Sequence, residues 1–95
     1  MNYKIIVNRH TAALYLSWEF GVKRAVELLA ALDGAEYIDL NQPGRNAGIS
    51  KWHPRRGYGV HTESDAHAAC AKIEAMALYQ AGRLGYAPAT LCYVA

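Results

Sequence analysis

A stretch of seventeen residues, from Asn41 to Gly57, contains three glycines and two prolines and divides the chain into two halves. Glycine and proline interrupt regular helices and strands, so this composition predicts a long loop at 41–57. Long loops without secondary structure are uncommon in small domains, and those that occur are often functional. The fold must therefore be built from the segments on either side.

The length and composition of the chain predict a single folded domain over residues 1–95. A sequence with 53% hydrophobic and 19% charged residues argues against disorder and supplies enough apolar surface for one core. No apolar run reaches the roughly 20 residues that a membrane-spanning helix needs. The first residues also lack the apolar region and cleavage site of a signal peptide. We therefore expect a cytoplasmic protein that does not associate with membranes.

The two cysteines, Cys70 and Cys92, do not show the C-x-x-C spacing of a redox or zinc motif. Because a domain with this core does not need disulfide bonds to fold, we predict that both cysteines are reduced thiols. A single bridge between them is the alternative.

In the first half of the chain, the β-branched run within 3–8 predicts a strand. The next segment fits two patterns, because its apolar residues alternate over 14–20 but also share a face of a helix. Ser17 is a good helix N-cap and Gly21 is unfavourable inside a helix. These two residues favour a hairpin strand followed by a helix over 22–32. Gly34 suits a left-handed helix end, and 36–40 alternates as a strand.

In the second half, 58–61 predicts a short strand and Thr62-Glu63-Ser64-Asp65 resembles a helix-capping box. We expect a helix from there to about Arg83 and a final strand over 90–94. The apolar and small residues of this helix predict one inner face: Ala66, Ala69, Cys70, Ile73, Met76 and Ala77.

The order of these elements predicts an α+β fold. Each half runs strand, Ser or Thr cap, helix, glycine turn and strand, which suggests a ferredoxin-like split βαβ sandwich (βαββαβ) with room for one extra N-terminal strand. Right-handed crossovers would place two helices on one face of an antiparallel sheet and leave the other face open. A homodimer through the sheet edges is compatible with this architecture, although no residue specifies one.

The loop also concentrates positive charge. The chain has a net charge of +2, but no acid lies between Asp39 and Glu63. Arginine neutralises phosphates or carboxylates, while tryptophan and tyrosine stack on bases or fill protein pockets. The residues of this predicted partner-binding site are Arg45, Lys51, Trp52, His53, Arg55, Arg56 and Tyr58. The alternative is a solvated basic loop with Trp52 folded onto the core.

The titratable and metal-binding residue types outside the loop have simpler structural explanations. His61, Glu63 and His67 could form an acid–base cluster, but the capping pattern around Thr62 explains the acids as helix-terminal residues. His67 and Cys70 share a helix face, yet zinc needs about four convergent ligands. We predict no metal and no cofactor. Leu78 and Tyr79 fall outside the inner face, so they either form an interface or pack against the C-terminal segment.

The run from Gly57 to Ala66, followed by an alanine-rich helix, resembles small accessory proteins of phages and mobile elements, the anti-CRISPR proteins among them. This resemblance implies a small α+β protein that blocks a partner's surface as a stoichiometric inhibitor, and it carries over no catalytic residue.

The leading hypothesis from the sequence is a non-enzymatic inhibitor that engages a protein or nucleoprotein through the basic loop. The alternative is an RNA- or single-stranded-DNA-binding domain that uses the same loop and the open sheet face. A small oligomeric enzyme with a cleft lined by His61, Glu63 or His67 is a third hypothesis.

Overall fold

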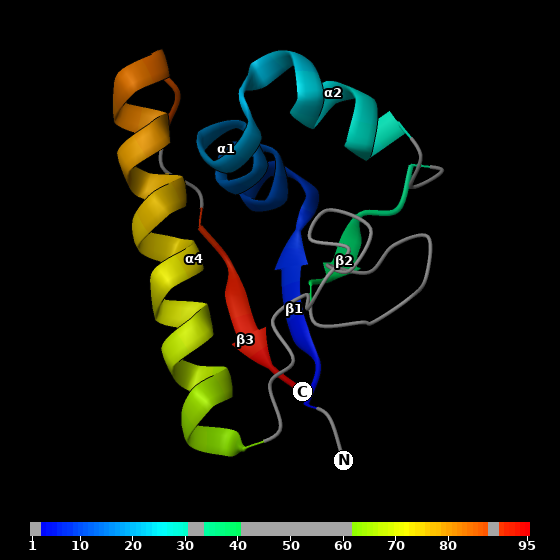
Figure 1. The fold of residues 1–95 in the computed structure, drawn as a ribbon, viewed down its shortest axis with the longest axis vertical. Coiled ribbons are helices and arrows are strands. Elements are labelled where there is room, and N and C mark those ends of the chain that lie inside the picture. The colour runs from blue at the N-terminus through cyan, green and yellow to red at the C-terminus, as the bar shows by residue number, and fades with distance from the viewer. Residues whose placement is uncertain (1–2, 31–33, 41–61, 88–89) are drawn as a thin grey trace.

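The computed structural model describes residues 3–30, 34–40, 62–87 and 90–95 and shows an α+β fold. Within these residues, three helices pack with a three-stranded antiparallel sheet (Figure 1). The elements in chain order are β1 (Ile5–Asn8), α1 (Arg9–Phe20), α2 (Val22–Ala30), β2 (Tyr37–Asp39), α4 (Glu63–Leu84) and β3 (Cys92–Val94).

Strand β1 changes into helix α1 without an intervening loop. Asn8 is the N-cap, and its side-chain oxygen accepts a hydrogen bond of 2.7 Å from the backbone N–H of Thr11. This bond satisfies one of the N–H groups that the first turn of a helix leaves unpaired. The expected hairpin strand over 14–20, and with it the extra N-terminal strand, is therefore wrong. Ser17 lies inside the helix, and the cap is nine residues earlier.

Gly21 separates α1 from α2. Its φ of 91° is costly for residues with a side chain, and its N–H donates to the Ser17 carbonyl to close the last turn of α1. Its own carbonyl then accepts from Ala25 in the first turn of α2. Gly21 therefore lies outside a helix interior, as the sequence predicts. It separates two helices, however, and is not preceded by a hairpin strand. The helix expected over 22–32 is confirmed over 22–30, and Gly34 has the expected positive φ.

The first turn of α1 also fixes the end of α2. The Arg9 guanidinium donates to the carbonyl of Leu29 at 2.8 Å and to that of Ala35 at 3.0 Å. A cation at the C-terminal end of a helix meets unpaired carbonyls and the negative end of the helix dipole. The Arg9 backbone N–H donates to Glu36, directly before β2. One residue therefore places α2 and β2 relative to α1.

The sheet has the order β2-β1-β3, with both outer strands antiparallel to β1. Ile5 and Val7 are fully buried and face the helices, whereas Ile6 lies opposite Asp39 and Tyr93 on the other face. The strand expected at 36–40 is confirmed as β2 and that at 90–94 as β3. β2 pairs directly with β1, whereas a split βαβ unit has another strand between its two strands. The strand expected at 58–61 lies outside the described residues, and the ferredoxin-like arrangement is not confirmed.

Helix α4 agrees closely with the helix predicted from the sequence. Thr62 accepts a hydrogen bond of 3.1 Å from the backbone N–H of Asp65, which confirms the predicted cap. The helix ends at Gly85 in the left-handed conformation. Five of the six residues predicted for its inner face are buried, and Met76 is partly buried.

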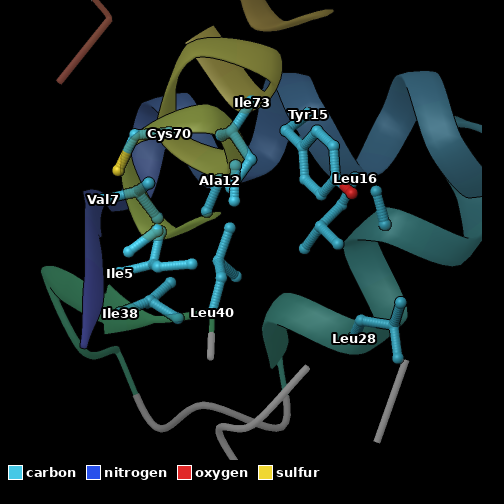
Figure 2. Packing of buried hydrophobic residues seen from close by; sticks show 13 residues of the cluster. Ile5, Val7, Ala12, Tyr15, Leu16, Leu28, Ile38, Leu40, Cys70 and Ile73 are labelled. Carbon is cyan, nitrogen blue, oxygen red and sulfur yellow. The ribbon is translucent and has the colours of Figure 1, made fainter. Parts of the chain in front are cut away.

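The core lies between the sheet and the helices (Figure 2). Tyr15 and Leu16 of α1 meet Ile5 of β1 and Ile73 of α4 in one cluster of buried side chains. A smaller cluster joins Leu14 of α1 to α4 near its C-terminal end. In the described part of the chain, no helix is both long enough and apolar enough to cross a membrane.

The Asn8 cap gives a direct test of the strand-to-helix junction. We expect Asn8→Ala to lower the free energy of unfolding by about 1 kcal/mol, because the Thr11 N–H loses its acceptor. Urea denaturation followed by circular dichroism measures this loss. Asn8→Asp keeps an acceptor oxygen and should retain most of the stability, so equal losses in the two variants would contradict the capping role.

Candidate functional site

The residues that the sequence predicts for partner binding lie outside the described residues. This applies to all seven members of the set: Arg45, Lys51, Trp52, His53, Arg55, Arg56 and Tyr58. Their role stays a prediction, and the candidate site is built from the remaining chain.

The titratable residues at the start of α4 lie in solvent. His67 Nε2 is 3.6 Å from a carboxylate oxygen of Glu63, one helical turn earlier, and both side chains are more than half exposed. Cys70, in contrast, is buried on the inner face. Within the described ranges, no three His, Cys, Asp or Glu side chains gather as a metal site would require. His61 lies outside those ranges.

A groove of about 360 Å³ lies between α1, α2 and the C-terminal end of α4. Most of its lining is apolar, and two polar side chains, His10 and Ser17, contribute to it. Its lining residues are His10, Ala13, Leu14, Ser17, Val22, Ala25, Val26, Leu29, Leu84 and Tyr86. The volume is within the range of sites that bind small molecules or clusters of side chains.

One wall of the groove is the exposed apolar stripe of α2. Ala25 and Leu28 are buried and attach the helix to the core. Val22 and Val26 are on the groove side, and 53% and 62% of their surface is exposed. Helix α2 is therefore attached to the core through Ala25 and Leu28. Among the described residues, no side chain covers Val22 and Val26.

The opposite wall follows the end of α4. The left-handed Gly85 turns the chain, and the Tyr86 N–H donates to the Ala81 carbonyl at 2.9 Å. The Tyr86 ring meets His10 edge to face, with 6.4 Å between ring centroids. His10 Nε2 also lies 3.4 Å from the carbonyl oxygen of Ala87. Leu84 and Tyr86 are 42% and 58% exposed.

The floor of the groove comes from α1. Leu14 is buried, and the Ser17 hydroxyl donates to the Leu14 carbonyl at 3.0 Å. Because both polar lining side chains interact within the protein, the groove presents an apolar surface to a ligand. Such a surface binds apolar groups through desolvation.

Positive charges lie beside both walls. Lys23 follows Val22 in α2, and Arg83 precedes Leu84 in α4; both are exposed. Arg83 lies over the Tyr79 ring at 5.8 Å and contacts the Gln80 side chain at 3.4 Å. Glu27 follows Val26 in α2 and lies 3.8 Å from Arg24. The charges of α2 and of the last turn of α4 therefore sum to a positive value, which favours a ligand that carries negative charge next to its apolar face.

Two further exposed apolar areas are present. Leu78 and Tyr79 on α4 are exposed, so these side chains are not packed against the C-terminal segment. On the sheet face away from the helices, Tyr37 and Tyr93 are about half exposed. Ile6 lies opposite Tyr93 in the register, so this face carries aromatic and aliphatic side chains side by side.

Sequence reasoning missed the groove. The helical periodicity places Val22, Ala25, Val26 and Leu29 on one apolar face, and such a face normally predicts burial. The periodicity identifies the stripe correctly but does not show whether a neighbouring element covers it. No local signal separates the buried Ala25 from the exposed Val22 and Val26 of the same face.

Comparison of the chain with protein-family models, with curated protein sequences and with solved structures finds no match.

Proposed function

We propose that the chain is a non-enzymatic binding protein whose groove accepts an apolar segment of a partner protein. One observation carries this proposal: Val22, Val26, Leu84 and Tyr86 are each more than 40% exposed around a single groove. Large exposed apolar patches on soluble proteins commonly mark interaction sites.

The position of the groove, between α2 and the end of α4, favours the side chains of a helix as occupant. The groove lies between two helices, and an amphipathic helix presents apolar residues at i, i+3, i+4 and i+7 to such a surface. The net positive charge of α2 and of the last turn of α4 favours acidic residues at the edges of that helix. The proposed ligand is therefore an acidic amphipathic helix of a protein partner.

The basic loop at 41–57 also favours an acidic partner. It carries four Lys or Arg residues and no acid, so it would add electrostatic attraction to an acidic partner. The resemblance to anti-CRISPR proteins supports an inhibitory outcome, in which the bound chain covers a surface that the partner needs. A strand at 58–61 also belongs to the proposal; because β1 already pairs with β2 and β3, this strand would extend the sheet at an outer edge.

The groove is tested by substituting Val26. We expect Val26→Glu to weaken binding of an acidic amphipathic helical peptide, selected for binding to the wild type, at least tenfold. The substitution places a carboxylate on the apolar wall, and this carboxylate repels the acidic peptide. Peptides are selected from a display library with acidic flanks, and affinity is measured by fluorescence anisotropy.

The control for this experiment is Leu78→Glu, which introduces the same charge at an exposed apolar position that does not line the groove. Both variants should unfold at the same temperature as the wild type, because neither position is buried. Equal binding by Val26→Glu and wild type would overturn the groove assignment. So would a loss of binding only in Leu78→Glu.

The loop contribution is tested by reversing charge at Arg55 and Arg56. We expect the double Glu variant to weaken binding of the same peptide several-fold, with the thermal midpoint unchanged. The loss should shrink at high salt, since exposed charges are screened. Unchanged affinity at low salt would exclude the loop from the binding surface.

Binding of RNA or single-stranded DNA is the second candidate function, and one observation favours it. Tyr37 and Tyr93 expose their rings on the sheet face that the helices leave open. Exposed aromatic rings on a sheet stack on bases, and nearby cations neutralise phosphates.

An oligonucleotide titration at several salt concentrations tests this second function. With four loop cations in contact with phosphates, the plot of log affinity against log salt should have a slope of about −3 to −4. Tyr37→Ala and Tyr93→Ala should each weaken binding, whereas Val26→Glu should weaken it less than either. No binding at low salt would remove this candidate.

A further inference from the structure

Cys70 and Cys92 come together at the contact between α4 and β3. Cys70 is buried on the inner face of α4. Cys92 begins β3 and lies opposite Val7 in the register. Val7 is fully buried, and directly opposite residues of paired strands point to the same face. The Cys92 side chain therefore points toward the helices.

The two thiols lie close enough for each to shift the pKa of the other. Both cysteines are free, and α4 packs directly on β3. Cys92 is only partly buried and packs at the edge of the core cluster that contains Cys70. The pair thus combines an inner sulfur with a more accessible one, and the fold holds them in contact.

We propose that Cys70 and Cys92 are a dithiol modification site, which closes to an intramolecular disulfide by exchange with a small disulfide of the glutathione type. This inference does not depend on the proposed binding function. It develops the alternative that the sequence leaves open, a single bridge between the two cysteines.

The exchange takes place in two balanced steps. The Cys92 thiolate attacks one sulfur of the small disulfide, forms a mixed disulfide and releases one small thiol. The Cys70 thiolate then attacks the Cys92 sulfur and releases the second small thiol. The protein loses two protons and two electrons, and the small disulfide gains them as two thiols.

Contact between the sulfurs makes the second step fast relative to dimer formation. The fold holds Cys70 next to the mixed disulfide, so the effective concentration of the attacking thiol far exceeds that of a second molecule. The bond would join α4 to β3 and enclose the segment 71–91. That segment contains Leu84 and Tyr86, so oxidation would restrain one wall of the groove.

The environment of the pair sets its pH dependence. Desolvation by burial raises the pKa of both thiols, and the Glu74 carboxylate acts in the same direction. The interaction between the two thiols lowers the pKa of Cys70 and raises that of Cys92. On the strand side, β1 presents the apolar Val7 opposite Cys92. Because only a thiolate attacks, the exchange is slow at neutral pH and accelerates as the pH rises.

The test incubates the full chain with glutathione disulfide, quenches with an alkylating reagent and measures the intact mass. We expect a monomer that has lost two hydrogens, with a peptide map that joins the Cys70 and Cys92 peptides. The rate should rise about tenfold per pH unit between about pH 7 and 8.5. The thermal midpoint of the oxidised protein should be higher by about 10 °C.

Single-cysteine variants distinguish the thiol that attacks the small disulfide from the thiol that resolves the mixed disulfide. Cys70→Ala should stop at the mixed disulfide on Cys92, whereas Cys92→Ala should leave the buried Cys70 mostly unmodified. The wild-type measurement stands without them if either variant fails to fold. A stable mixed disulfide in the wild type, disulfide-linked dimers, or oxidation that occurs only in denaturant would each overturn the proposal.

Discussion

The first turn of α1 is the interaction on which the rest of the structure depends. Its first three residues each hold a segment that is distant in the sequence. Arg9 binds the carbonyls at the end of α2 and before β2, and His10 meets the Tyr86 ring and the Ala87 carbonyl. Thr11, which is fully buried, accepts a hydrogen bond from the N–H of Leu91 at 3.0 Å, just before β3. The Asn8 cap orients all three, because it fixes where the helix begins.

This arrangement explains why the groove persists in the isolated chain. Its two walls do not pack on each other; each is attached separately to α1. Arg9 holds the end of α2, and Gly21 sets the angle at which α2 leaves α1. The opposite wall is held by His10 and by the left-handed turn at Gly85. Closing the groove would require breaking these hydrogen bonds or straining a helix end. The apolar surface is therefore kept open by the packing of each wall on α1 together with polar contacts at the ends of the walls.

The sequence predicts those features that a few neighbouring residues determine. Thr62 and Asp65 are close in the chain, and the cap, the length and the inner face of α4 are confirmed. The strands around Ile5 and Ile38 follow from local β-propensity and are also confirmed. The strand prediction for 14–20 is wrong because alternation and helical periodicity coexist in this segment, and because the strand propensity of 3–8 hides the role of Asn8 as a helix cap. The pairing of β2 with β1 and the exposure of Val26 depend on tertiary contacts that no local pattern records.

The candidate binding surface and the dithiol are connected through the same segment of chain. Between Cys70 and Cys92, the chain forms most of α4, contributes Leu84 and Tyr86 to the groove, and returns to the sheet beside β1. In the reduced protein, Tyr86 contacts α1 through its ring and His10, and Leu91 contacts α1 through its hydrogen bond to Thr11. A covalent link at the base of this segment would lower its freedom to move away from α1. A ligand that requires the groove in its present shape would then meet a smaller ordering cost, because part of that entropy is lost before binding. Oxidation would thus act on affinity through the mobility of one wall, with no change in the residues that contact the ligand.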